Sequence, residues 1–157
     1  MSIGNSRIAH GFAPVASRLH PVERVTDTLE VGLFTGWLFP IRQIQRIEAY
    51  GGDDDASMAA DNTSAFNCRF AQAAGPKRWS EHAYGRAIDV NPVENPYVEG
   101  ARVSPPSGRA FANRSRSRPG MAVTGGVLVR AFAARGWSWG GRWTGTPDYQ
   151  HFSTSGR

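Results

Sequence analysis

The chain has 157 residues, an apolar content of 40% and a net charge of +5, with 18 glycines and 10 prolines. This length predicts one domain with its own core, and the glycine and proline content predicts short elements joined by many loops. No run approaches the ~18 apolar residues of a membrane-spanning helix, and a lone cysteine, Cys68, excludes an internal disulfide and a cysteine-based zinc knuckle.

The N-terminal part predicts an arm followed by a helix. Residues 1–20 have no clear period, and residues 21–38 are ambiguous, with apolar residues around 29–34 that are compatible with a short strand. Residues 1–36 are expected to form a lead-in arm. They lack a basic segment followed by a long apolar run, so we expect no secretory signal peptide. Isoleucines recurring at helical spacing after a proline predict a helix over 40–50 with a core-facing stripe, ended by two glycines: Pro40, Ile41, Ile44, Ile47, Gly51 and Gly52.

The middle of the chain predicts a loop between the helix and two strands. Three consecutive aspartates, 53–55, open a polar loop to residue 62, and no glycine-and-glutamate pattern of a calcium-binding loop follows them. Residues 63–70 are compatible with a strand in which Cys68 is a buried apolar side chain. Residues 86–91 predict a second strand, ended by Pro92.

The C-terminal part predicts a long loop, a helix and two strands. Residues 92–120 contain five prolines and many serines and arginines, which predicts a long loop or lid. Apolar residues at helical spacing predict a helix over 122–135, ended by Gly136. Residues 137–140 and 148–152 are the last two strand candidates.

Two histidines and an aspartate are candidate metal ligands. His82 and Asp89 are seven residues apart, but Gly85 and the β-branched residues that follow it argue against one continuous helix. We therefore expect His82 on a loop, Asp89 on the following strand, and His151 on a final strand that closes the site beside Asp89. Three ligands with an open fourth position match catalytic zinc, and Asp148 is a carboxylate available to act on a water. His10 and His20 have no acidic neighbours at useful spacing and are not expected to bind metal.

The pattern resembles a known peptidase family. Ser-x-His-x-x-Gly-x-Ala-x-Asp, present from Ser80 to Asp89, and acid-x-x-His, present as Asp148 and His151, are similar to the zinc motifs of the VanY-like D-alanyl-D-alanine carboxypeptidases and L-alanyl-D-glutamate endopeptidases. The resemblance covers about residues 38–152, including the context around Asn67 to Arg69 and residues 136–143.

The resemblance implies a fold and a set of roles. It implies a small α+β domain over 37–157, with an antiparallel sheet holding the metal and helices and long loops around it. It implies one zinc ion bound by His82, Asp89 and His151, with Asp148 as general base and Arg69 stabilising the oxygen of the cleaved carbonyl. Ser80 and Tyr84 are implied, more loosely, to contact substrate.

Three tryptophans near glycines have two interpretations. Flat aromatic faces suit sugars and peptide stems, so Trp139 and Trp143 are candidate substrate-binding residues, and a place in the core is the alternative for each of them. Trp137 is expected to belong to the core.

The implied activity is hydrolysis of an amide bond in peptidoglycan stem peptides, acting at the cell wall after secretion or phage delivery, as an endolysin does. Residues 101–157 carry nine arginines against Asp148 alone, so an anionic cell-wall polymer is a further candidate partner. The stretch from Arg109 to Arg118 has few aromatics, so no specific nucleic acid is expected, and a solvated loop is the other interpretation. The alternative functions are a catalytically silent zinc module and a polyanion-binding protein.

Overall fold

The computed structural model describes residues 39–71 and 76–157. The arm predicted over 1–36 therefore lies outside the described residues. Within these described ranges, short helices, two of them α-helices, occur together with antiparallel strands, so the predicted α+β class is confirmed. In chain order the elements are η1 (Ile47–Tyr50), α3 (Asp54–Ala59), η2 (Glu81–Tyr84), β1 (Ala87–Asp89), β2 (Tyr97–Glu99), β3 (Arg102–Ser104), η3 (Pro106–Phe111), α4 (Val127–Ala133), β4 (Ser138–Trp139), η4 (Gly140–Arg142) and β5 (His151–Ser153).

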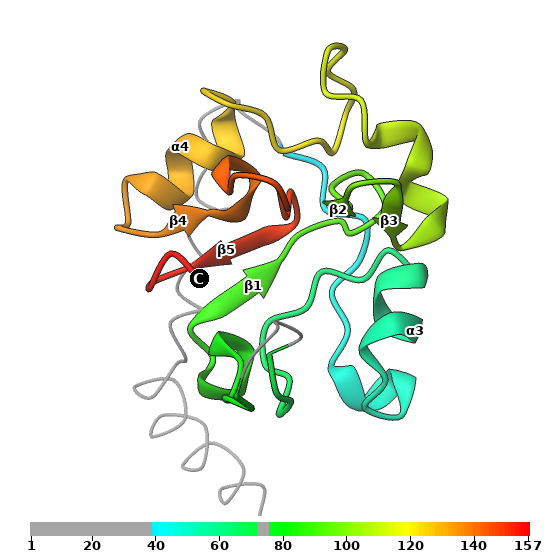
Figure 1. Ribbon diagram of the computed structural model, residues 1–157, viewed down its shortest axis with the longest axis vertical. Helices are drawn as coiled ribbons and strands as arrows, with labels where there is room; N and C mark the ends of the chain where they lie inside the picture. Colours follow the sequence, from blue (N-terminus) through cyan, green and yellow to red (C-terminus); the bar gives the residue numbers. More distant parts are fainter. Residues whose placement is uncertain (1–38, 72–75) are drawn as a thin grey trace, which may run out of the picture.

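The centre of the fold is a three-stranded antiparallel sheet in the order β1-β5-β4, with β5 in the middle (Figure 1). Asp89 at the end of β1 pairs directly with His151 at the start of β5. Strands β2 and β3 form a separate hairpin. The predicted strands over 86–91 and 137–140 and the predicted helix over 122–135 are confirmed in shorter form, while β5 begins only at His151.

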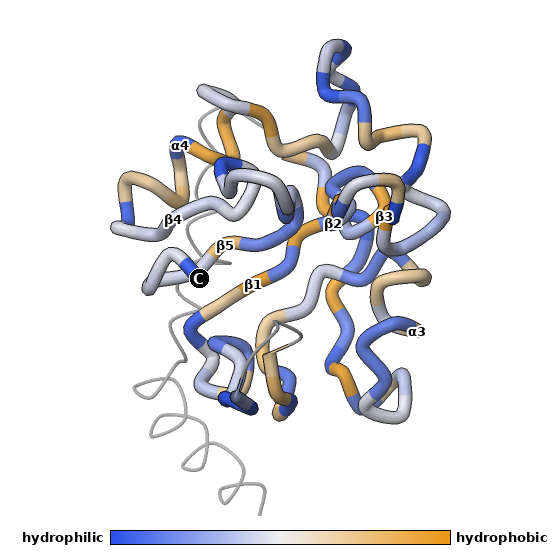
Figure 2. The backbone as a smooth tube through the Cα atoms, in the orientation of Figure 1, coloured by the Kyte–Doolittle hydropathy of each residue, from blue (hydrophilic) through white to orange (hydrophobic). Residues whose placement is uncertain are grey.

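The core lies between α4 and the central sheet. Phe132 of α4 stacks on Phe152 of β5, with 4.1 Å between ring centroids, and Trp137 lies against the same Phe132 ring. Leu128 and Ile88 are also fully buried there. Figure 2 shows the apolar residues on α4 and along β1. This packing makes the sheet a rigid support for the side chains at its edge.

The helix predicted over 40–50 is wrong. Only Ile47–Tyr50 is helical, and Ile44 is 51% exposed and forms an isolated bridge with Thr63. The backbone before it is instead paired with distant segments: Gln43 accepts from the Thr63 N–H, and Gln45 donates to the side chain of Asn62. Long-range pairing has outweighed a weak helical preference in a segment this short.

The polar loop predicted over 53–62 is also wrong, because α3 begins there. Asp53 is its N-cap and accepts from the N–H of Ala56 at 3.1 Å, and Asp54 and Asp55 occupy the first turn. Acidic side chains favour the positive end of a helix, so the three aspartates were a helix-start signal.

Three further predictions need correction. Residues 63–70 form isolated bridges instead of a continuous strand, and Cys68 is exposed instead of buried. The loop predicted over 92–120 contains the β2–β3 hairpin and η3. The hairpin is ordered by its own ladder and by the bridge from Tyr97 to Asp148.

A pair of neighbouring acids makes stability depend on pH. Burial raises the pKa of Asp61 to about 7, with the nearby carboxylate of Glu94 adding to the shift. Between pH 4 and 7 the folded state therefore holds a proton that the unfolded state has released, and the free energy of unfolding falls as pH rises. Asparagine keeps the acceptor for the Val93 N–H and suits the positive φ of 58° at this position.

Asp61→Asn is therefore expected to raise the free energy of unfolding at pH 8 by about 1 kcal/mol and to change it little at pH 4. Denaturant titrations of the metal-free protein at both pH values measure this difference. Equal effects of the substitution at the two pH values would contradict it.

Candidate metal centre

His82, Asp89 and His151 come from three different elements. The short helix η2 carries His82. The Ser80 hydroxyl caps η2 by accepting a hydrogen bond from the backbone N–H of His82 at 3.3 Å. Gly85 ends that turn with a positive φ of 60°, which glycine adopts without strain, and the chain then enters β1. Asp89 and His151 meet through the pairing of β1 with β5. The predicted convergence of the three residues is confirmed.

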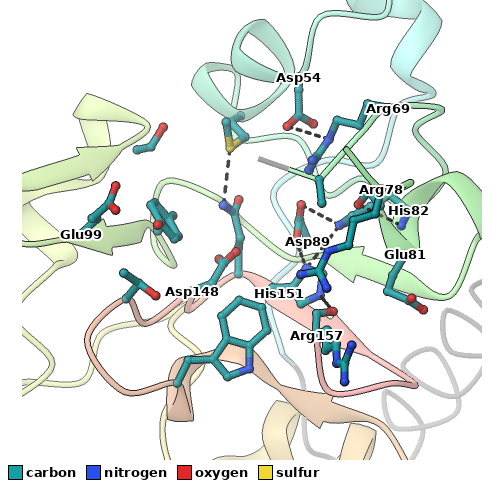
Figure 3. Close-up of a pocket in the computed structure, with 18 of the residues that line it drawn as sticks. Asp54, Arg69, Arg78, Glu81, His82, Asp89, Glu99, Asp148, His151 and Arg157 are labelled. Atoms are coloured by element: carbon teal, nitrogen blue, oxygen red, sulfur yellow. Dashed lines mark hydrogen bonds and ion pairs between the residues drawn. The ribbon is translucent and has the colours of Figure 1, made fainter. Parts of the chain in front are cut away.

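The three side chains form a tight, buried cluster, which Figure 3 shows at the centre of a cavity. His82 Nε2 lies 3.1 Å from one carboxylate oxygen of Asp89, and His151 Nδ1 lies 3.1 Å from the other. The two imidazole nitrogens are 3.3 Å apart. One ligand atom from each residue lies within 4.8 Å of the others, so the cluster could hold a metal ion.

The hydrogen bonds on the outer side of each imidazole decide what the cluster needs. His82 Nδ1 lies 2.7 Å from the backbone oxygen of Ala65, and His151 Nε2 lies 2.8 Å from that of Arg157. A carbonyl oxygen only accepts, so each of these nitrogens carries the hydrogen and donates. A neutral imidazole then turns a lone pair towards Asp89. Three acceptors with no donor among them require a proton or a metal cation between them, and outer hydrogen bonds of this kind typically orient metal-binding histidines.

The pKa shifts of Asp89 and His151 also indicate that the cluster favours a positive charge. Burial disfavours the charged form of Asp89, but the two imidazoles outweigh it and hold the pKa of this carboxyl well below its usual range. Burial also opposes a charged His151, yet its contact with Asp89 raises the pKa of the imidazole to about 9. The residues present therefore fit zinc, which accepts imidazole and carboxylate ligands.

A second carboxylate, Asp148, lies in the same cavity. Its backbone N–H donates to Gly140 at 3.1 Å, and a Cβ on Gly140 would come within 2.7 Å of the Asp148 carbonyl, so this approach requires glycine. Burial, with help from the charge of Asp89, raises the pKa of Asp148 to about 6. Its Oδ1 is buried and has no hydrogen-bond partner in the described part of the chain. The carboxylate is thus a stronger base than that of an ordinary aspartate, and its Oδ1 is free to accept a hydrogen bond.

Arg69 also lines the cavity, where Asp54 from the first turn of α3 holds it. The Nε of Arg69 lies 3.0 Å from Asp54 Oδ2, and Asn67 donates to the other oxygen of Asp54 at 2.9 Å. Burial raises the pKa of Asp54, although the guanidinium of Arg69 lowers it. Sequence reasoning missed Asp54 because it assigned these aspartates to a solvated loop.

A family model described as D-alanyl-D-alanine carboxypeptidase matches residues 74–154, just over half of the chain. The chain belongs to this family. The match includes the three cluster residues and Asp148, and it confirms the resemblance inferred from the motifs. No curated protein and no solved structure matched the chain.

As a member of this family, the chain is a metallopeptidase, and the family acts on peptidoglycan. Among the described residues, no helix is long and apolar enough to span a membrane. Arg69 and Asp54 precede the matched region, so their place in the cavity comes from the structure alone.

The remaining predicted substrate residues of this peptidase have different surroundings. Trp143 lines the cavity, with its ring 5.3 Å from that of His151. Ser80 also lines it, although its hydroxyl caps η2. Trp139 is only 6% exposed, belongs to the core and donates to the Tyr149 carbonyl, so the core alternative holds for it. Tyr84 is 50% exposed, lies under the Arg86 guanidinium and is not among the cavity-lining residues.

Proposed function

We propose that the chain is a zinc metallopeptidase that hydrolyses an amide bond in peptidoglycan stem peptides, either as an L-Ala-D-Glu endopeptidase or as a D-Ala-D-Ala carboxypeptidase. Its site of action is the cell wall, reached by secretion or phage delivery, and residues 37–157 are its catalytic domain. The observation that carries the proposal is the set of three buried acceptors, His82, Asp89 and His151, which require a cation. The family match supports the peptidase class.

Zinc held by these three residues would lower the pKa of a water and polarise the carbonyl to be cleaved. Asp148 takes a proton from the attacking water and later delivers it to the leaving amine. Its buried oxygen without a partner and its raised pKa suit that task. Trp143 and Ser80 line the cavity of about 620 Å³ in which the peptide binds.

Arg69 stabilises the negative charge that develops on the carbonyl oxygen. Its guanidinium is a permanent cation, and Asp54 fixes its direction from the side remote from the metal ligands. A donor of this kind is worth about 3 kcal/mol of transition-state stabilisation. Asp54 is therefore a positioning residue that acts through Arg69.

The pair can be tested with a double-mutant cycle. Arg69→Ala is expected to lower kcat/KM about a hundredfold, and Asp54→Ala about tenfold. Because Asp54 acts through Arg69, the double variant is expected to be no slower than Arg69→Ala alone. Steady-state kinetics on one stem peptide measure all four proteins. Fully additive losses would show that Asp54 has a separate structural role.

Mass spectrometry of defined stem peptides incubated with the zinc-loaded protein tests the proposed function. Loss of a terminal D-alanine identifies a carboxypeptidase, and separation of L-Ala from D-Glu identifies an endopeptidase. Asp148→Ala is the inactive control. Peptides left intact by both proteins would overturn the proposal and favour a catalytically silent zinc module.

A further inference from the structure

A second cavity shares part of its lining with the catalytic one. It has a volume of about 530 Å³ and lies between α3 and the chain that leaves β3. Met58, Arg102 and Ser104 line both cavities. The two cavities therefore adjoin at these three residues. We call the second cavity the α3 groove, and it is lined by Asp55, Met58, Ala59, Arg102, Val103, Ser104, Pro105, Pro106 and Arg109.

Two arginines give this groove a positive character. Arg109, in the last turn of η3, is exposed and has no ion pair within the described ranges. Arg102 is also exposed, and its one carboxylate neighbour in the described part of the chain, Glu99, is 3.9 Å away. Asp55 is the only acid that lines the groove among the described residues, and Glu99 is the neighbour of Arg102, so Arg109 is the guanidinium of the groove without an ion pair there.

Two other arginines of this region, Arg114 and Arg118, have structural tasks. Arg114 donates to the carbonyls of Glu94 and Phe111, and its guanidinium lies 4.4 Å from the ring centroid of Tyr149. Arg118 donates to the Ala110 carbonyl and stacks over Phe111. Of the four arginines between 109 and 118, only Arg109 lines the groove, and Arg116 is exposed outside both cavities.

We propose that the α3 groove is a binding subsite for a carboxylate-bearing residue of a peptide whose cleaved bond lies in the catalytic cavity. Arg109, which has no ion pair in the described part of the chain, holds the carboxylate, since a guanidinium presents a planar fork of donors that matches its two oxygens. The apolar side chains of Met58, Val103 and Pro105 contact the peptide backbone between the cleaved bond and the carboxylate. This inference rests on the proposed function, and it makes the substrate a chain that extends beyond the cleaved bond, as in endopeptidase cleavage.

A panel of stem peptides tests the subsite. Each free carboxylate of the peptide is replaced in turn by a carboxamide, and kcat/KM is measured with the zinc-loaded protein, with Arg109→Gln and with Arg116→Gln. The last variant removes an equal charge outside the groove and serves as the matched control. One amidation is expected to cost the unmodified protein and Arg116→Gln about five- to tenfold, and to cost Arg109→Gln nothing.

Binding of the same panel to zinc-loaded Asp148→Ala, with and without Arg109→Gln, is measured by calorimetry. A difference in affinity between a peptide and its amidated form that disappears with Arg109→Gln supports the subsite. If no peptide is cleaved but this difference is seen, only the proposed function fails. An unmodified protein indifferent to every amidation, or discrimination that survives Arg109→Gln, overturns the subsite even if cleavage occurs. Loss of poly-glutamate binding in Arg109→Gln, without any change across the panel, overturns it in favour of an anionic polymer.

Discussion

Asp148→Asn is expected to lower kcat about a thousandfold while zinc remains bound, because a carboxamide cannot accept the proton of the attacking water. The substitution preserves shape, and Asp148 is not one of the three residues whose acceptor atoms converge. Its backbone stays fixed by the hydrogen bond to Gly140 and the bridge to Tyr97, so the fold is expected to persist. Single-turnover cleavage of a stem peptide and metal analysis of the same sample measure both effects.

Asp148→Glu is the matched control for this prediction. It keeps the carboxylate but lengthens its arm by one methylene, so the base reaches the water in a less favourable position. We expect a loss of about tenfold, far smaller than for asparagine. Activity of Asp148→Asn within about tenfold of the unmodified protein would show that another group moves the proton. Loss of zinc from Asp148→Asn would show that Asp148 supports the metal instead.

The convergence of His82, Asp89 and His151 was predictable because part of its signal is local. Ser80, His82, Gly85 and Asp89 occupy one short segment in which a cap, a turn glycine and a β-branched run each favour a single backbone state. His151 was expected on a final strand beside Asp89, and the resemblance of acid-x-x-His to the second motif of the family marked it as the third ligand. The strand that carries His151, β5, pairs with β1, and the apolar residues Ile88 and Phe152 of these two strands are buried.

The errors concern residues whose state is decided by distant partners. Ile44 had the spacing of a core residue, but the segment around it is held in extended pairing with residues 62–63. Trp139 is in the core because its indole N–H reaches the Tyr149 carbonyl, a contact that no sequence pattern shows. Asp54 was missed for a similar reason: its partner, Arg69, is fifteen positions away, and their contact depends on how α3 packs in the folded chain.

Asp89→Asn is expected to remove most of the stabilisation of the protein by zinc. At a free zinc concentration about a thousandfold above Kd, a bound ion stabilises the folded state by about 4 kcal/mol, or roughly 10 °C in Tm for a domain of this size. The carboxamide of this variant would contribute no negative charge between the two imidazoles. Since even outer partners of metal ligands are worth about 10–100-fold in affinity, the loss of this ligand is expected to cost more than about a hundredfold.

Thermal unfolding with and without zinc measures this prediction independently of any substrate. Glu48→Gln, the same chemical change at an exposed position of η1, is expected to retain the full zinc-dependent shift. The comparison separates ligand loss from a general effect of charge, because both variants lose one carboxylate and only Asp89 faces the imidazoles. An equal shift in Asp89→Asn and Glu48→Gln would place the ion elsewhere and would remove the basis for assigning the cluster to zinc. A shift that disappears only in Asp89→Asn would show that the three buried acceptors are satisfied by the metal.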